Sequence, residues 1–329
     1  LRVRPQELRL ALALPRLLRR RGAALCHTQH ALPLRPPCPC VVTVHDLSFE
    51  RRPELMGWKD RFVFRLAVPR AARRAARVLT VSERTKRDLV ELYGVPAERI
   101  EVTPNGVDPA FHPFDPSRRS DPGAGLPGDS FDPFRPSDPG AGPPGDSFDP
   151  SRPSDPGADL PCDTLSQGSY ALAVGAIQAR KNPLAALEAA SAVGLPLVVV
   201  GPEKDAALAA ELRRRGAHVL GYVETERLAR LYRGAACLVQ ASRYEGFGLP
   251  VLEAMASGTP VVAVREPALE EVAGEAAVFV EEGGLADGIR RALAERERLA
   301  AAGLERARAF SWRATAERTL AVYQEILGA

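Results

Sequence analysis

Two carboxylates and a glycine loop in the segment 241–262 form the group of residues best suited to chemistry. Glu245 begins the loop Glu-Gly-Phe-Gly-Leu, and Glu253 lies about one turn into a helix that we predict at 250–257. Glycine lets backbone N–H groups approach a ligand closely, and the start of a helix carries a partial positive charge. The loop would therefore suit an anionic or hydroxyl-rich ligand. The structural alternative is that Glu253 complements the helix start and Glu245 is a solvated loop charge.

A second group of charged residues follows a strand that we predict at 171–174. Gly175 begins a loop that carries Arg180 and Lys181, and Pro183 opens the next predicted helix. Two cations at the carboxyl end of a strand could neutralise a diphosphate. A solvated Arg-Lys pair on a surface loop is the structural alternative.

Polar residues also follow the strands predicted in the first third of the chain. These residues are His27, His45, Asp46, Ser82 and Asn105. Ligands of parallel sheets collect beyond the carboxyl ends of the strands, so these side chains are candidates for binding or catalysis. Each also has a structural explanation. Ser82 is a suitable N-cap for the next helix, Asn105 belongs to an Asn-Gly turn signal, and an isolated histidine is more often structural than catalytic.

The elements that must position these residues alternate between strand and helix patterns. In the first part of the chain, the pattern predicts strands at 23–26, 41–44, 78–81 and 100–103, and helices at 4–21, 59–77 and 83–93. In the second part, it predicts strands at 171–174, 197–200, 219–220, 237–240, 261–264 and 277–280, and helices at 183–193, 205–215, 225–234, 250–257 and 285–302. Strands that alternate with crossover helices form parallel sheets. We therefore predict an α/β protein with two Rossmann-like, doubly wound parallel-sheet domains, the first of them incomplete.

Four segments follow from this pattern. They are a first domain at 1–112, a linker at 113–167, a second domain at 168–311 and a terminal helix at 312–329 with Ser311 as its N-cap. Three copies of one repeat, rich in Pro, Gly, Asp and Ser, fill 115–165. These copies offer almost no apolar surface, so we predict that the linker is disordered. Duplication of a linker is one explanation of the repeats, and a binding segment is the other.

Composition narrows the class of protein. The 329 residues, 45% of them hydrophobic, can bury two cores of ordinary domain size. No apolar run approaches the roughly 18 residues of a membrane span, and no signal peptide is recognisable, so we expect a cytoplasmic protein. Five cysteines without a Cys-x2-Cys pair argue against a disulfide framework and a zinc site.

The net charge of +3 conceals an asymmetry, because residues 1–112 carry ten excess positive charges and the remaining residues carry seven excess negative ones. A basic half suggests a polyanion or an anionic membrane surface as partner. We do not expect nucleic acid, because no helix-turn-helix or zinc-finger spacing accompanies the charge. The predicted helix 59–77 could be a peripheral membrane contact, or a solvated basic face over a core stripe. Its relevant residues are Arg61, Phe62, Val63, Arg65, Leu66, Arg70, Arg73, Arg74 and Arg77.

The spacing from Glu245 to Glu253, filled as EGFGLPVLE and followed by AMASGTPVV, resembles the signature of the retaining nucleotide-sugar glycosyltransferases of family 4, which have the GT-B fold. The segments TVHDLSF, VSERTKRDL and PNGVD occur in the order that this family shows in its first domain. The resemblance covers about 25–112 and 168–329. It includes both the interior and the tail of the E-x7-E signature, so it is specific.

The cationic loop also fits this family, with one departure. Gly175 and Lys181 match the G-x5-K pattern, but Ala176 stands where many members have an arginine. Arg180 could supply the missing charge, as in the branch of the family that has Arg-Lys-Asn here. The segment 221–223, Gly-Tyr-Val, resembles the part of the family whose backbone binds the nucleotide base, although ordinary strand termination explains it equally well.

The resemblance implies a role for each candidate residue. Glu245 would hold hydroxyl groups of the donor sugar, Glu253 would hold the ribose, and His45 would close over the sugar. The two cations and the loop amides would hold the diphosphate and the sugar. The implied donor-binding residues are Asn105, Arg180, Lys181, Val223, Gly246, Phe247, Gly248, Leu249 and Glu253.

The implied activity is transfer of a hexosyl unit with retention of configuration, most similar to the bacterial mannosyltransferases of surface-polysaccharide assembly. The donor would be a nucleotide diphosphate sugar such as GDP-mannose or UDP-glucose, and the acceptor a glycan or a lipid-linked sugar. Because no D-x-D motif is present, we expect no metal and no other cofactor. Cations and a helix dipole would then stabilise the leaving diphosphate. The last helix, 312–329, would cross back to the first domain.

Other classes remain open. A sugar epimerase shares the GT-B shape but lacks this filled signature, and a phosphorylase would need a phosphate or cofactor site that we do not find. A protein that binds nucleotide without transferring sugar is the stronger rival. A GT-B first domain normally opens with a strand and a glycine-rich loop, and neither is recognisable here. We therefore expect a member truncated by roughly 40–60 upstream residues, on the scale of a few strand-helix units, that binds a nucleoside diphosphate but transfers sugar slowly or not at all.

Overall fold

The computed structural model describes residues 12–113 and 170–328. The predicted disorder of the repeats at 115–165 falls outside these ranges. Of the helix predicted at 4–21, the described part is α2 (Leu14–Arg21), which has Pro15 in its first turn. Proline is tolerated there because the first N–H groups of a helix have no partner within it.

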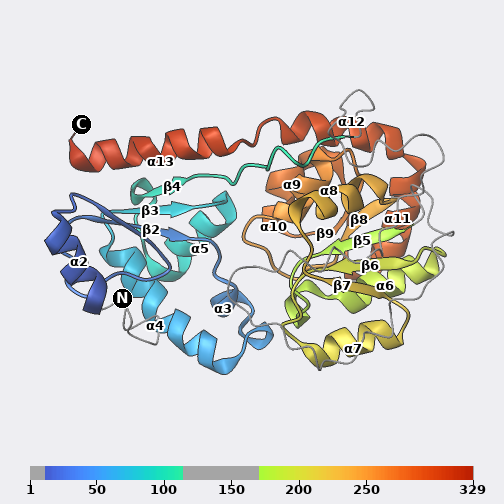
Figure 1. Cartoon of the computed structure of the whole chain (residues 1–329), viewed down its shortest axis with the longest axis horizontal. Coiled ribbons are helices and arrows are strands. Elements are labelled where there is room, and N and C mark those ends of the chain that lie inside the picture. Colours follow the sequence, from blue (N-terminus) through green and yellow to red (C-terminus); the bar gives the residue numbers. More distant parts are fainter. Residues whose placement is uncertain (1–11, 114–169, 329) are drawn as a thin grey trace, which may run out of the picture.

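The first domain is a parallel sheet of four strands that stand in chain order (Figure 1). Its strands are β1 (Cys26–Gln29), β2 (Cys40–Val44), β3 (Arg77–Thr80) and β4 (Ile100–Val102). Its further helices are α3 (Ser48–Arg51), η2 (Pro53–Leu55), α4 (Trp58–Arg74), α5 (Glu83–Tyr93) and η3 (Ala97–Arg99). The strand predicted at 23–26 was placed three residues too early, because β1 buries only alternate residues and contains no apolar run.

The two faces of this sheet are covered by different helices. Val42, Val44 and Val78 point to the face where α4 and α5 pack. Val41 and Leu79 point to the opposite face, where the last helix of the chain packs. Alternate residues of a strand point to opposite faces, so this division follows from the strand geometry. Figure 1 shows α4 below the sheet and α13 above it.

The second domain is a parallel sheet of six strands in the order β10-β9-β8-β5-β6-β7, with helices on both faces. Its strands are β5 (Ala171–Val174), β6 (Leu197–Val200), β7 (His218–Gly221), β8 (Cys237–Gln240), β9 (Val261–Val264) and β10 (Ala277–Val280). Its helices are η4 (Ala179–Lys181), α6 (Pro183–Ala192), α7 (Ala206–Arg214), α8 (Thr225–Gly234), α9 (Leu249–Ala256), α10 (Pro267–Ala273), η5 (Gly274–Ala276), η6 (Glu282–Gly284), α11 (Leu285–Ala294) and α12 (Arg296–Ala307). The predicted fold class, two parallel-sheet α/β domains, is confirmed.

Two features of the second domain differ from the prediction. The helix α10 was not predicted, because its seven residues are too few to show a periodic pattern. The single helix predicted at 285–302 is two helices that meet at Glu295, whose backbone angles, φ −104° and ψ 21°, are not helical. The guanidinium of Arg296 donates to the carbonyls of Ala235 and Ala236, which fixes the start of α12.

The chain ends with α13 (Trp312–Leu327), which leaves the second domain and lies along the first (Figure 1). Ser311 is its N-cap and accepts a hydrogen bond from the N–H of Ala314. The Thr315 hydroxyl donates to the carbonyl of Pro104, and Val322 packs on the sheet. This helix and the interface described below join the two domains.

Candidate active site

The centre of the candidate site is the carboxylate of Glu245, which is buried at the end of β8. Lys181 Nζ lies 2.5 Å from its Oε1 and Arg180 Nη1 lies 3.2 Å from its Oε2. Gln240 Nε2 also donates to Oε1, at 2.7 Å. Burial alone would raise the pKa of Glu245, but Lys181 and Arg180 outweigh it and hold this pKa below its ordinary value. The site therefore holds one carboxylate and two cations, which leaves one positive charge in excess.

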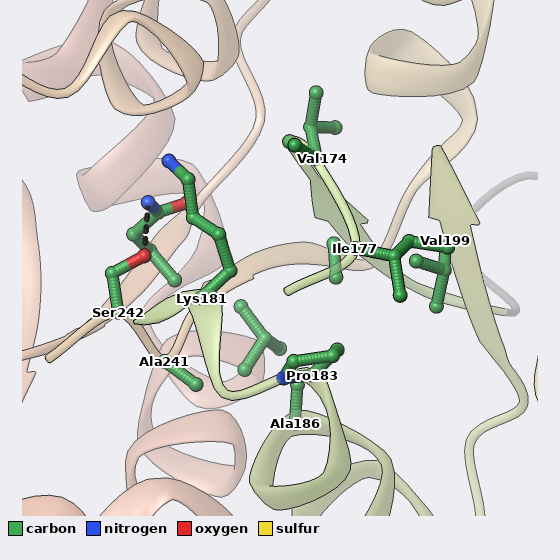
Figure 2. Close-up of a pocket in the computed structure, with 13 residues that line it drawn as sticks. Val174, Ile177, Lys181, Pro183, Ala186, Val199, Ala241 and Ser242 are labelled. Carbon is green, nitrogen blue, oxygen red and sulfur yellow. Dashed lines mark hydrogen bonds between the residues drawn. The ribbon is translucent and has the colours of Figure 1, made fainter. Parts of the chain in front are cut away.

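The two cations reach Glu245 because of the local path of the chain. They lie in the short helix η4, and Asn182 turns the chain into α6 with a positive φ of 47°. Arg180 Nη1 also donates to the Tyr244 carbonyl at 2.7 Å, which ties the two loops together. Figure 2 shows Lys181 and Ser242 at the carboxyl ends of neighbouring strands, where Gln240 Nε2 donates to Ser242 Oγ at 2.9 Å.

The glycine loop after Glu245 lies directly against the first domain. A Cβ at position 246 would overlap the backbone carbonyl of His45, so only glycine fits there. Ser82 Oγ donates to the Gly246 carbonyl at 2.6 Å and accepts from the Thr85 N–H at 3.2 Å. Ser82 is thus the N-cap of α5, as its structural explanation predicts, and also a contact between the domains.

The loop presents backbone donors at the start of α9. Gly248 has a φ of 106°, a conformation that favours glycine, and Leu249 begins the helix. The N–H groups of Phe247, Gly248 and Leu249 have no hydrogen-bond partner within residues 12–113 and 170–328. The Phe247 side chain is buried and contacts Phe310, with ring centroids 5.9 Å apart. The loop can therefore donate to an anion through its backbone while its side chain anchors it.

The second carboxylate, Glu253, does not share the cluster around Glu245. Its Oε2 accepts a hydrogen bond of 2.8 Å from the hydroxyl of Tyr232. Burial raises the pKa of Glu253, the Tyr232 hydrogen bond lowers it, and nearby Asp108 raises it further. The structure thus places the two carboxylates in separate environments: Glu245 is charged and paired with cations, whereas Glu253 is bound to a neutral donor.

In the first domain, His45 forms a ring contact with a histidine that the sequence analysis did not single out. The rings of His30 and His45 have centroids 5.3 Å apart. Burial lowers the pKa of both imidazoles, so both are neutral at pH 7. His30 has a positive φ of 60°, rare for a residue with a side chain, and its buried Nδ1 has no partner among the described residues. No apolar run or motif includes His30, so the sequence did not indicate that it lies at the site.

The remaining predicted residues lie at two places, the carboxyl edge of the first sheet and the core of the second domain. Asn105 lines a pocket at the carboxyl edge of the first sheet together with His27 and His45. Val223 is buried in the core after β7, so only its backbone could contact a ligand. His27 makes hydrogen bonds to Thr43 and Tyr323, which gives it a structural function.

A tyrosine next to Glu245 holds the two domains together, and it too was missed from the sequence. The Tyr244 hydroxyl accepts from the N–H of Leu47 at 3.2 Å and donates to Asp88 at 3.0 Å. The Arg84 guanidinium lies over the Tyr244 ring at 5.0 Å and its Nη1 lies 3.3 Å from Glu266. This interface fixes Glu245 relative to the first domain, since Tyr244 precedes it in the chain.

Comparison with known proteins identifies the family of the chain. The family described as Glycosyltransferase Family 4 matches residues 1–111, and the family described as Glycosyl transferases group 1 matches residues 165–309. The chain belongs to the group 1 glycosyltransferases of family 4. The two matches leave out most of the repeats and the last helix.

This glycosyltransferase is 29% identical over 304 residues to the O-antigen chain mannosyltransferase B of Escherichia coli, covering 86% of this chain and 70% of that protein. It is 31% identical over 280 residues to the D-inositol 3-phosphate glycosyltransferase of Acidothermus cellulolyticus, covering 77% of this chain and 54% of that protein. The structure of Anabaena HepE in complex with UDP and glucose matches with a TM-score of 0.67 and 16% identity, over 100% of this chain and 84% of that chain. The last comparison shows the fold alone.

The described residues 12–113 and 170–328 contain neither a cluster of metal-binding side chains nor a membrane-spanning helix. Within them, no group of three or more His, Cys, Asp or Glu side chains could hold a metal ion. No helix in the described ranges is long and apolar enough to cross a membrane.

Proposed function

We propose that this glycosyltransferase moves a hexosyl unit, which we take to be mannosyl, from a nucleotide diphosphate sugar to a glycan or lipid-linked acceptor, with retention of configuration. The observation that carries the proposal is the buried Glu245 with its two cations, followed by Gly246, which packs against the His45 backbone at the interface of two Rossmann-like domains. The choice of mannose rests on the similarity to the E. coli O-antigen mannosyltransferase. GDP-mannose and UDP-glucose are the first donors to test.

In this proposal the diphosphate lies at the cations and the loop amides. Departure of a nucleoside diphosphate concentrates negative charge on the phosphate oxygens as the bond to the sugar breaks. The excess positive charge at Arg180 and Lys181 and the N–H groups at the start of α9 would stabilise that charge. They are already in place before the reaction, so little reorganisation is needed. Glu245 would bind sugar hydroxyls and hold the cations in position.

The acceptor would attack the same face of the sugar from which the diphosphate leaves. The bond from the anomeric carbon to phosphate oxygen breaks, the bond to the acceptor oxygen forms, and the acceptor proton passes to the phosphate. Neutral His45 could hydrogen-bond the sugar on the side of the first domain. We propose that His30 positions the His45 ring, because the two rings are in contact and His30 adopts an unusual backbone conformation. Glu253 would bind the ribose, and the backbone at Val223 would bind the base. Asn105 would contact the donor from the side of the first domain.

The proposal is tested by donor binding and donor consumption with one matched pair of variants. Lys181→Met removes a cation of the cluster, whereas Arg214→Met removes an exposed cation of α7 in the same domain, which pairs with Glu211 on the surface. GDP and UDP affinity is measured by calorimetry, and GDP-mannose or UDP-glucose loss by chromatography. We expect at least tenfold weaker diphosphate binding for Lys181→Met and no change for Arg214→Met. Equal affinities would overturn the site. If the protein binds GDP or UDP but consumes neither donor with every acceptor tried, the result would favour a protein that binds nucleotide without transferring sugar.

We also propose peripheral association with an anionic membrane, where a lipid-linked acceptor would be found. The excess of basic residues in the first domain supports this location.

A further inference from the structure

The helix α4 carries large apolar side chains on its solvent side. The exposed fractions are 70% for Trp58, 68% for Phe62, 41% for Val63 and 68% for Leu66. Exposed apolar residues that lie singly on a surface need no explanation, but four on the first nine residues of one helix form a patch. We call these four residues, with the outward cations named below, the α4 outer face.

The opposite side of α4 provides the contacts that hold it in the fold. Val68, Ala71 and Ala72 are buried against the first sheet. Trp58, Phe62 and Leu66 are spaced four residues apart, so they form one row along the helix, on the side away from that core. The fold therefore does not need this row, because α4 is already anchored by its inner residues.

The cations of α4 divide into two groups, and this corrects the surface expected from the sequence. Four arginines bind within the protein: Arg61 to the carbonyl of Pro53, Arg65 to Glu50, Arg73 to the carbonyl of Tyr93, and, just after the helix, Arg77 to Glu325. Arg70 and Arg74 are exposed and have no ion-pair partner in the described residues. Arg70 and Arg74 continue the four-residue spacing of the apolar row beyond Pro69, which lies inside α4, and Lys59 Nζ lies 5.6 Å from the centroid of the Trp58 ring. The outer face thus combines apolar residues near the start of α4 with arginines near its end.

We propose that the α4 outer face docks on the surface of an anionic bilayer. Tryptophan, phenylalanine and leucine beside outward cations fit the boundary between acyl chains and anionic head groups. The only acidic residue of the helix, Asp60, lies on its flank at the mouth of a pocket. A second copy of this chain would have to meet like charges at Arg70 and Arg74, which disfavours self-association through this face.

Docking through α4 would also bring the site to the membrane. Met56, just before α4, and Phe64, within it, line a pocket between the domains that Arg180 lines from the other side. The apolar row begins next to this pocket, so a docked α4 would open it near the head groups. This consequence rests on the proposed transfer to a lipid-linked acceptor, whereas the docking itself does not.

Trp58 provides a direct probe of the docking. The chain has two tryptophans, and Trp312→Phe leaves Trp58 as the only one. We expect its fluorescence emission to shift to shorter wavelength with vesicles of phosphatidylcholine and phosphatidylglycerol, and not with phosphatidylcholine alone. The shift should weaken in 1 M salt, where charges are screened beyond roughly 3 Å. An unchanged emission with the anionic vesicles would overturn the proposal, whatever the catalytic activity.

Matched variants separate this face from general adhesion. Phe62→Ser with Leu66→Ser removes the apolar row, and Leu320→Ser with Tyr222→Ser removes two exposed apolar side chains elsewhere. In vesicle co-sedimentation we expect the first pair to lower the partition coefficient at least tenfold and the second to leave it unchanged.

The cations are tested in the same assay, with a control for self-association. Arg70→Gln and Arg74→Gln should each lower partitioning about fivefold on anionic vesicles, because a basic residue near such a surface contributes about 1 kcal/mol. Partitioning that is equal for all variants would overturn the α4 outer face as the docking site. A Trp58 shift that depends on protein concentration without vesicles would instead identify a second copy as the occupant and would also overturn the proposal.

Discussion

Neutralising Glu245 perturbs the candidate site without changing its shape. In Glu245→Gln, Arg180 and Lys181 lose the only charged partner that they have among the described residues, while their side chains stay just 19% and 15% exposed. Removing one partner of a fully buried ion pair costs about 3–5 kcal/mol, and the residual exposure of the cations lowers this to about 2–4 kcal/mol. At about 2–4 °C per kcal/mol for a protein of this size, the melting temperature should fall by about 4–16 °C.

A nucleoside diphosphate should restore part of this loss. In the variant the two cations are no longer neutralised, so GDP or UDP should raise the melting temperature more than it does in the unchanged protein. Ligand at about 100 times its Kd stabilises by about 2.7 kcal/mol, which differential scanning fluorimetry resolves. Glu282→Gln is the matched control, because it removes an exposed carboxylate paired with Arg243 in the same domain, where we expect less than about 1 kcal/mol. Equal melting temperatures for the two variants, with equal ligand shifts, would refute the argument.

Three further predictions concern the domain interface and the first domain. Burial raises the pKa of Glu266 from 4.5 to about 7, so the folded state binds a proton that the unfolded state has lost, and the free energy of unfolding falls as pH rises from about 5 to 8. In urea melts, Glu266→Gln should remove this dependence of the free energy of unfolding on pH. An unchanged dependence in the variant would contradict the prediction. Asparagine tolerates the positive φ of His30, so His30→Asn should keep the backbone and remove the ring contact with His45. We expect kcat to fall more than tenfold at unchanged donor affinity, and the pKa of His45, measured by NMR, to shift. If kcat and this pKa are both unchanged, His30 does not position His45. Gly246→Ala should separate the domains, because the added Cβ overlaps the His45 carbonyl, and backbone hydrogen exchange at residues 45–47 should become faster. Gly283→Ala is the control, since a Cβ at position 283 meets no atom within 4 Å. Equal exchange rates at residues 45–47 in the two variants would refute the contact.

The elements of the second domain were predictable because its strands are buried on both faces. Continuous runs such as Leu197–Val200 and Val261–Val264 are apolar at every position, and the structure has strands at those residues. In the first domain, β1 is half-buried and reads as polar, so its position was missed by three residues. The break at Glu295 was not visible, because helical periodicity continues on both sides of it.

The candidate site was only partly predictable from the sequence. The pairing of Glu245 with Arg180 and Lys181 brings together residues that are more than 60 positions apart, and the resemblance to family 4 implied that both groups bind the donor, Glu245 at the sugar hydroxyls and the cations at the diphosphate and sugar. It did not predict that they bind each other. His30 and Tyr244 contribute through contacts with the other residues of the interface, which depend on tertiary packing and leave no spacing pattern in the sequence.

The central claim is that this chain transfers a sugar from a nucleotide diphosphate donor with retention at the Glu245 cluster. The most direct test follows the anomeric proton by NMR while the chain is incubated with GDP-mannose or UDP-glucose, using water and a panel of glycan and lipid-linked sugars as acceptors. We predict that the first product has the anomeric configuration of the donor, and that Glu245→Gln abolishes its formation while Glu282→Gln does not. A first product of inverted configuration, or the same rate of donor loss in Glu245→Gln, would contradict the account.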